Sequence, residues 1–431
     1  MAEAGKELLI GQTLVFPENP FKAGVESAAH NSRGGVLVEN GKIAAVGNSD
    51  DLKAAHSDAT ITDYGDDLIM PGFIDTHVHF PQTAIIASWG KRLIDWLNSY
   101  TFPEEMRFGD PDFADQIAET FFDLSLSHGT TTVASFCTIH PESVEAFFSE
   151  AQNRGLCAVG GKICMDRNAP DGLRDTVQSA SDDSKRLLEK WHGVDRLTYA
   201  VTPRFSPTST REQLQALGSL WSEHPDCPMQ THLSEQTDEV AWVKDLFPEA
   251  RDYLDTYEAA GLIGEGAMFG HSIYLTERER ARIKETKGAL IHCPTSNTFI
   301  GSGLFNMDGL TGEGQIVGLA TDTGGGSSFS MLRTMAAAYE IGQLRDRPLH
   351  PAELLWLATE GSARALRMAS KIGRLVPGND ADLVVLDLKS TPAISQRATR
   401  ANDIWEEVFP TIMMGDDRAV RDVRVMGKKA L

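Results

Sequence analysis

Eight short apolar runs alternate with amphipathic stretches through the middle of this chain of 431 residues, and this alternation limits the folds open to it. The runs have the length of buried strands, and several intervening stretches begin at Ser, Thr or Pro and end at Gly, as helices do. Alternating strand and helix units of this number predict an α/β fold, a parallel (β/α)8 barrel. The runs are the one ending at His79, then TTTVASFC, CAVGGKICM, LTYAVTPRF, MQTHL, AMFGHSI, ALIHC and IVGLATD.

The two ends of the sequence do not continue this alternation. Short strand patterns broken by Gly and Asn occur near the start, in ELLIGQTLVF and GGVLVENGKIAAVG, and near the end, in DADLVVLDL and VRDVRVMGKKAL. We expect the two ends to build one small β-sandwich together. The predicted organisation is therefore a first sandwich segment over residues 1–66, the barrel over 67–374 and a second sandwich segment over 375–431.

Composition argues against several classes of partner. Asp and Glu number 61 against 40 Lys and Arg, a net charge of −21, whereas nucleic-acid binders carry a basic footprint. The opening MAEAGKELLIGQTLVF has no basic region followed by an apolar core, and no apolar run approaches membrane-spanning length. We expect no nucleic-acid partner, no membrane association and a cytoplasmic location.

The five cysteines are scattered and form no Cys-x-x-Cys pair, which fits reduced thiols rather than a disulfide framework. Cys293 follows a histidine in HCPTSN, so it could be a nucleophile or a metal ligand. Neighbouring residues on a strand face opposite sides, so at most one of His292 and Cys293 faces a site there. We expect Cys293 to be structural.

Histidines and an aspartate stand at the ends of successive apolar runs. His77 and His79 close IMPGFIDTHVHFPQ, and residues two apart on a strand face the same side. MQTHLSE places His232, AMFGHSIYL places His271 and IVGLATDTGGG places Asp322 in the same context. Singly, each could be a core histidine or a capping aspartate. Together, at the carboxyl ends where barrels keep their catalytic groups, they predict a divalent metal site with a position open for water.

These motifs resemble the amidohydrolase family. PGFIDTHVH, HLSE, GHS, LATD and the closing GRLVPGNDADLVVLD carry the resemblance, which spans nearly the whole chain. Members of this family are metal-dependent hydrolases on a (β/α)8 barrel with a split β-sandwich. A narrower resemblance, in DWLNSYTFPEEMRF, TPRFSPTS and HVHFPQ, is to the branch of the family that deaminates guanine.

The resemblance implies a hydrolase of purine catabolism in which activated water attacks C2 of guanine and gives xanthine and ammonia. It also implies a homodimer and one divalent metal per chain, Zn2+ or alternatively Fe2+. The implied metal ligands are His77, His79, His232 and Asp322. A metal held there would lower the pKa of bound water toward about 7.

A purine amine leaves only if it is protonated, so the reaction needs a proton shuttle beside the metal. Glu235, three residues beyond His232, is the candidate; we expect it on the first turn of the next helix, where it could alternatively be a carboxylate stabilised by the helix dipole. The resemblance implies that Asp322 also accepts the proton of the water. His271 would hold that water by a hydrogen bond or complete the metal shell.

The resemblance further implies that Gln82, Arg204 and Phe205, together with His232, bind guanine. Arg204 offers fixed donors, Gln82 can donate and accept, and Phe205 can stack on the base. Without the metal residues, TPRF would be better interpreted as a surface arginine beside a core phenylalanine. Trp89, in the long loop after the first strand, could cover the site as part of a lid. We expect instead that it packs like an ordinary core residue.

Three alternatives stay open. A binuclear member of the family would carry a carbamylated lysine at the end of the fourth strand, where we place Arg204. Lys162 lies on the third strand by our count, so an error of one strand in that count would revive this alternative. A different deaminase would act on 8-oxoguanine, an adenosine derivative, cytosine or a triazine. A scaffold without activity would have lost ligands that are present here. His140 and Glu142 form the His-x-Glu of cytidine-type zinc deaminases, but no Cys-x-x-Cys completes that motif.

Overall fold

The computed structural model describes residues 5–90 and 92–430, and contacts divide the chain into two compact units. One unit combines Met1–Asp75, Leu124–Thr132 and Phe329–Leu431, and the other combines Thr76–Asp123 and Val133–Ser328. Residues 1–4 and 431 of the two predicted sandwich segments lie outside the described residues. The domain bounds at 66/67 and 374/375 stay a prediction.

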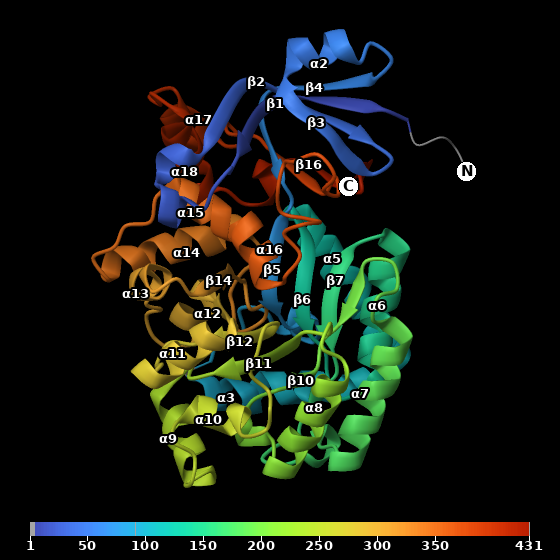
Figure 1. The fold of residues 1–431 in the computed structure, drawn as a ribbon, viewed down its shortest axis with the longest axis vertical. Helices are drawn as coiled ribbons and strands as arrows, with labels where there is room; N and C mark the ends of the chain where they lie inside the picture. Colours follow the sequence, from blue (N-terminus) through green and yellow to red (C-terminus); the bar gives the residue numbers. More distant parts are fainter. Residues whose placement is uncertain (1–4, 91, 431) are drawn as a thin grey trace. The chain divides into compact units, whose positions relative to one another are not determined.

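Strands from both ends of the chain share one sheet in the first unit, as the sequence predicts (Figure 1). The seven strands lie in the order β17-β16-β15-β4-β1-β2-β3. Antiparallel pairing of Val384 with Met70 joins the C-terminal strands to the N-terminal ones, and Leu9, Val36 and Leu383 share a buried core. The strands are β1 (Glu7–Val15), β2 (Ala29–Glu39), β3 (Lys42–Asn48), β4 (Thr60–Pro71), β15 (Leu383–Leu386), β16 (Val420–Val425) and β17 (Lys428–Lys429).

Helices of the first unit come from the same two stretches of chain. They are α1 (Pro20–Ala23), α2 (Ser49–Ala55), α14 (Met331–Leu344), α15 (Pro351–Trp356), α16 (Ser362–Ala365), α17 (Pro392–Ala398) and α18 (Ile404–Met414). α14 packs against α18.

The eight predicted apolar runs all form strands. Two runs are interrupted, so that the third gives β7 and β8 and the fourth gives β9 and β10. The strands are β5 (Phe73–Val78), β6 (Thr130–Phe136), β7 (Cys157–Gly161), β8 (Ile163–Cys164), β9 (Leu197–Tyr199), β10 (Thr202–Pro203), β11 (Met229–Leu233), β12 (Ala267–His271), β13 (Ala289–His292) and β14 (Ile316–Leu319). Their orders are β5-β6-β7-β9, β11-β12-β13-β14 and β10-β8. The strands pair in parallel between β7 and β9, between β8 and β10, and along β11 to β14.

Backbone hydrogen bonds close these sheets into a ring. Gln230 N donates to Val201 O at 3.0 Å, which joins β11 to the chain between β9 and β10. At the other junction Asp322 N donates to His77 O at 3.0 Å, joining the segment after β14 to β5. The predicted (β/α)8 barrel is confirmed, and Arg204 directly follows the last residues of the fourth strand, which ends at Pro203.

The helices of the barrel begin and end where the sequence signals them. Thr176, Thr210 and Thr276 cap helix starts with their side chains, and Gly155 ends α6 in the left-handed region at φ 69°. The helices are α3 (Leu93–Trp96), α4 (Phe102–Glu105), α5 (Pro111–Ser127), α6 (Pro141–Arg154), α7 (Val177–Trp191), α8 (Arg211–Glu223), α9 (Thr237–Leu246), α10 (Tyr253–Glu258), α11 (Glu277–Thr286), α12 (Pro294–Phe299) and α13 (Met307–Gly312). In Figure 1, α6 and α7 flank β6 and β7.

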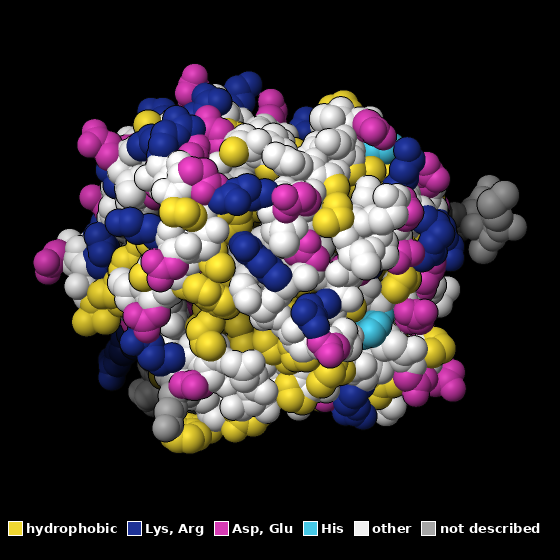
Figure 2. All heavy atoms as spheres, turned by 90° about the horizontal axis from the view of Figure 1, so that it is seen from below, with side chains coloured by type: hydrophobic (Ala, Val, Ile, Leu, Met, Phe, Trp, Pro, Cys, Tyr) yellow, Lys and Arg dark blue, Asp and Glu magenta, His cyan; other side chains and the backbone are white. Residues whose placement is uncertain are grey.

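Charges of both signs are mixed on the surface. Figure 2 shows a face on which Lys and Arg alternate with Asp and Glu instead of gathering into one basic stripe, while hydrophobic side chains gather near its middle. Within the part of the chain that the structure describes, no helix is both long enough and apolar enough to cross a bilayer. All five cysteines are buried and none is in a disulfide.

Candidate active site

Barrel strand ends bring the predicted metal residues together. His77 lies in β5 and His79 directly follows it, His232 lies in β11, His271 ends β12 and Asp322 follows β14. All five side chains are buried. Carboxyl ends of parallel strands meet at one end of a barrel, which explains why residues so distant in the sequence converge.

Four ring-nitrogen and carboxylate atoms, which we call the metal cluster, face one another at spacings that one metal ion would impose. His79 Nε2 lies 3.2 Å from His232 Nε2 and 3.6 Å from Asp322 Oδ1, and His77 Nε2 lies 3.5 Å from Asp322 Oδ1. Ligands about 2.1 Å from a tetrahedral zinc are about 3.4 Å apart. The cluster therefore fits one divalent ion.

The protonation of the cluster also suits a cation. Burial holds the pKa values of His79 and His232 well below the ordinary value, so both imidazoles stay neutral, which is the ligating form. His232 Nδ1 lies 2.7 Å from Arg204 O and donates to it, leaving Nε2 unprotonated toward the cluster. Burial raises the pKa of Asp322, but the hydrogen bond from His77 and the nearby imidazoles lower it to about 2.

Sharp backbone turns aim these side chains. Ser234, His271, Ser272 and Asp322 have φ values between 50° and 64°, in the left-handed region that residues other than glycine seldom adopt. Such conformations cost on the order of 1–3 kcal/mol each and persist only where the surroundings hold them. Ser272 N donates to Leu233 O at 2.9 Å, so the neighbouring strand end fixes one of these turns.

Glu235 lies in the loop before α9 and not on the first turn of that helix, which corrects the prediction. Gln236 is the N-cap, and its capping box with Glu239 starts the helix at Thr237. The Glu235 carboxyl is buried, and burial raises its pKa although His271 and Ser302 oppose the shift. Ser302 Oγ donates to Glu235 Oε1 at 2.7 Å.

His271 stands between two carboxylates. Its Nε2 lies 3.6 Å from Glu235 Oε2 and 3.7 Å from Asp322 Oδ2, and its Nδ1 lies 2.9 Å from Asn297 Oδ1. Burial lowers the pKa of His271, but Glu235, Asp322, the hydrogen bond with Asn297 and Glu239 together raise it, so the net shift is upward.

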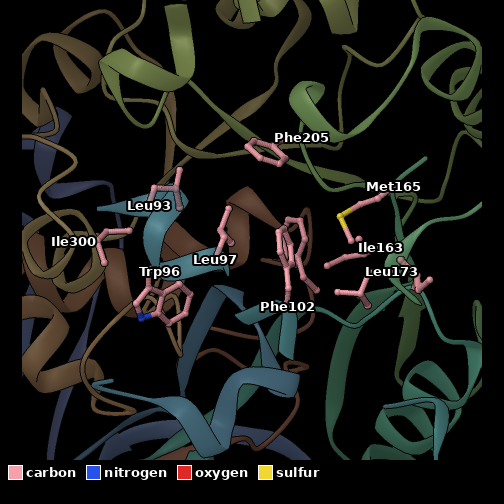
Figure 3. Close-up of a cluster of buried hydrophobic side chains, with 11 residues drawn as sticks. Leu93, Trp96, Leu97, Phe102, Ile163, Met165, Leu173, Phe205 and Ile300 are labelled. Atoms are coloured by element: carbon pink, nitrogen blue, oxygen red, sulfur yellow. The ribbon is translucent and has the colours of Figure 1, made fainter. Parts of the chain in front are cut away.

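A cavity of about 410 Å³ opens beside the metal cluster. Gln82, Arg204 and Phe205, the predicted substrate residues, line it together with His232, Glu235, His271 and Asp322. Apolar side chains complete the wall (Figure 3): Leu93, Trp96, Leu97 and Ile300. Polar groups at one end and flat apolar surfaces along the sides suit a small planar polar molecule.

Glu105, at the end of α4, was not anticipated. It is fully buried; its Oε1 accepts from Gln82 Nε2 at 2.9 Å and its Oε2 accepts from Arg204 Nη1 at 2.6 Å. YTFPEE marks this segment in the sequence, but four helical residues give no periodic signal. Asn297 and Ser302 were missed as well, because each is a small polar residue in a connection after β13.

Three residues linked to the alternatives have other places in the fold. Lys162 lies between β7 and β8, and its Nζ donates to both carboxylate oxygens of Asp175 at 2.7 Å. His140 is the N-cap residue of α6, and Glu142 lies in that helix's first turn.

One further expectation needs revision, because Trp89 is 75% exposed and so is not ordinary packing. Cys293 is buried, and its Sγ belongs to a group of donor atoms, with those of His77, His271 and Asp322, that lie within 4.8 Å of one another. The expectation that Cys293 is structural stays a prediction.

A (β/α)8 barrel with buried histidines and an aspartate at its strand ends defines a class of metal-dependent hydrolases. The sequence model of the amidohydrolase family matches residues 68–429, and the chain belongs to this family. A bacterial imidazolonepropionase-like composite domain matches residues 34–59.

Several similar proteins and solved structures bear the name guanine deaminase. The chain is 41% identical over 394 residues to guanine deaminase of Escherichia coli K12, covering 91% of this chain and 90% of that protein. The solved structure of E. coli guanine deaminase superposes with a TM-score of 0.96 at 38% identity, covering 98% of this chain and 99% of that one. Guanine deaminase from C. acetobutylicum, solved with guanine bound in its active site, gives a TM-score of 0.90 at 28% identity, with 99% and 100% covered.

Proposed function

We propose that this chain is a guanine deaminase, which hydrolyses guanine to xanthine and ammonia. One observation carries the proposal: a single cavity is lined by residues of the metal cluster, by a buried acid and by the polar residues suited to a purine. Relatives that bear this name match over about nine-tenths of both chains.

His77, His79, His232 and Asp322 hold one divalent metal in this proposal, either zinc or iron, because the donor set suits both. When bound, such a metal lowers the pKa of water toward neutrality and so supplies a nucleophile. Neutral imidazoles and an ionised carboxylate are already in the required protonation states.

Glu235 moves the protons of the reaction. Hydrolysis adds water across C2, and Glu235 transfers the first proton of that water to N3 of the ring. The second proton, from the hydroxyl now on C2, passes through Asp322 to the amino group, which leaves as ammonia. A raised pKa suits Glu235 for accepting and returning a proton near neutral pH. His271, within 4 Å of both acids, holds the water in place.

Arg204, Gln82 and Phe205 hold the base. Arg204 offers N–H donors to a carbonyl oxygen, Gln82 offers an amide, and Phe205 provides a ring face at the cavity wall. His232 contributes an edge of the same cavity.

The test is ammonia release by purified, metal-replete protein given guanine, with 8-oxoguanine, adenine, cytosine and dihydroorotate in parallel. We expect fast release from guanine and one metal per chain by elemental analysis. Removal of the metal by a chelator should abolish turnover, and zinc or iron should restore it. Two metals per chain would revive the binuclear alternative, and preference for another substrate would overturn the assignment of the pocket.

We also propose that the protein acts in purine catabolism in the cytoplasm as a homodimer. Five buried cysteines, none of them in a disulfide, fit a reducing compartment. Analytical ultracentrifugation should give twice the chain mass, and cell fractionation should find the activity with cytoplasmic markers; a monomer or a secreted enzyme would contradict these points.

A further inference from the structure

Glu105 is a fully buried carboxylate at the edge of the cavity for which the proposed reaction has no use. Each of its oxygens is engaged: Oε1 accepts from Gln82 Nε2 at 2.9 Å, and Oε2 accepts from Arg204 Nη1 at 2.6 Å. Both partners are residues that line the cavity. Glu105 thus joins the two polar side chains proposed to read the base.

The contact with Glu105 fixes the orientation of the Gln82 amide. An ionised carboxylate can only accept hydrogen bonds, so the NH2 group of Gln82 must face Glu105 and its carbonyl oxygen must point away. Gly324 N lies 3.4 Å from that oxygen and donates to it, which agrees with the same orientation. Gln82 Oε1 therefore serves as an acceptor and is not free to exchange places with the amide nitrogen.

Arg204 is fixed from three sides. Its Nη1 donates to Glu105, its backbone oxygen accepts from His232, and its guanidinium carbon lies 5.6 Å from the centre of the Phe102 ring. Phe102 and Glu105 are three positions apart in α4, so one short helix supplies both contacts. The remaining N–H groups of Arg204 are donors with a fixed direction.

We propose that Glu105 is the positioning residue that makes the pocket select the lactam edge of guanine. This inference rests on the proposed function and adds a physical basis for its substrate specificity. Arg204 donates to the oxygen on C6, and Gln82 Oε1 accepts from the adjacent N1–H. A purine without that edge, with a bare acceptor at N1 and no oxygen on C6, leaves both protein groups buried and unpaired.

The test compares guanine with 2-aminopurine, which has the same amino group on C2 but lacks the C6 oxygen and the N1 proton. Glu105→Gln keeps one acceptor oxygen and replaces the other with an NH2 donor, so it can no longer accept from both Gln82 and Arg204. We expect kcat/KM for guanine to fall about 100-fold, mainly through KM, as for loss of a buried charged partner. The preference for guanine over 2-aminopurine should fall at least about tenfold, and metal content should not change.

Glu104→Gln is the matched control. Glu104 is also buried, but its carboxylate pairs with Arg107 at 3.0 Å instead of with Gln82 and Arg204. This variant should keep the wild-type preference. Thermal unfolding of both variants reports whether either change merely damages the fold.

If Glu105→Gln does not fold, Gln82→Met is measured instead, since it keeps the pair of Glu105 and Arg204 but removes the acceptor. It should lose the same preference. Absence of guanine turnover in the wild type would overturn the proposed function. An active wild type whose variants keep the preference for guanine would overturn the role of Glu105 alone.

Discussion

The metal cluster and the guanine pocket differ in the elements that supply them. The cluster is built from barrel strands and the residues just after them, and Arg204 likewise directly follows β10, whereas Gln82 and Glu105 come from the long connection after β5. Strands are fixed by ladders of backbone hydrogen bonds, and connections are free to vary. The difference predicts that metal binding depends on the barrel strands and substrate selectivity on this connection, so each should be removable without the other.

Glu235→Gln should give the largest effect, and it should impair the catalytic step without impairing guanine binding. Gln cannot carry the proton, so we expect kcat to fall by about 10³-fold or more while guanine still binds. Metal content by elemental analysis and guanine binding by calorimetry serve as the controls. Activity within a few-fold of wild type would remove Glu235 from the mechanism.

Arg204→Ala should instead impair guanine binding and leave the metal in place. The pocket loses its donors and Glu105 loses its charged partner, so kcat/KM for guanine should fall by about 10²-fold. Because an unpaired buried carboxylate costs about 3–5 kcal/mol, the melting temperature should fall as well. Metal content should remain at the wild-type level; unchanged catalytic efficiency would sink the proposed pocket.

Ser302→Ala tests whether the hydrogen bond from Ser302 to Glu235 supports the catalytic step. Ser302 Oγ receives a hydrogen bond from Gln236 Nε2 at 3.1 Å, so its single proton is directed to Glu235 Oε1. Loss of a hydrogen bond to a charged group should lower kcat about tenfold with little change in KM. Ser302→Thr keeps the hydroxyl and should recover most of the rate; equal loss in both variants would indicate a steric role.

Trp89→Ala should have the smallest effect. With 75% of its surface exposed and no place in the cavity wall, Trp89 contributes little to binding in this structure. We expect kcat and KM within about twofold of wild type, as for an ordinary surface position. A tenfold rise in KM, measured by steady-state kinetics, would instead show that Trp89 covers bound substrate.

The same difference explains what the sequence could predict. The barrel and its strand-end histidines follow from period and position, because the carboxyl ends of barrel strands meet at the end of the barrel where the site forms. Glu105 follows from no such rule. Its partners Gln82 and Arg204 lie 23 and 99 positions away, and only the folded connections bring them within hydrogen-bond distance.

Glu235 shows a limit of a different kind. A carboxylate just after a strand and just before a helix was expected on the helix, but Glu239 accepts from the backbone N–H groups of Glu235 and Gln236 and so sets the start of α9 later. Trp89 was expected to be packed because large aromatic residues usually are. Its exposure depends on the path of a long loop, which local sequence does not encode.

Closure of the barrel ring has a consequence for the order of events during synthesis. The segment after β14 donates to His77 O, and Thr76 Oγ1 donates to Leu319 O across 243 positions of sequence. A nascent chain that has not yet released this last strand lacks Asp322 and one wall of the ring. We expect metal uptake to coincide with closure of the barrel ring, so the appearance of activity would report when the segment after β14 has joined β5.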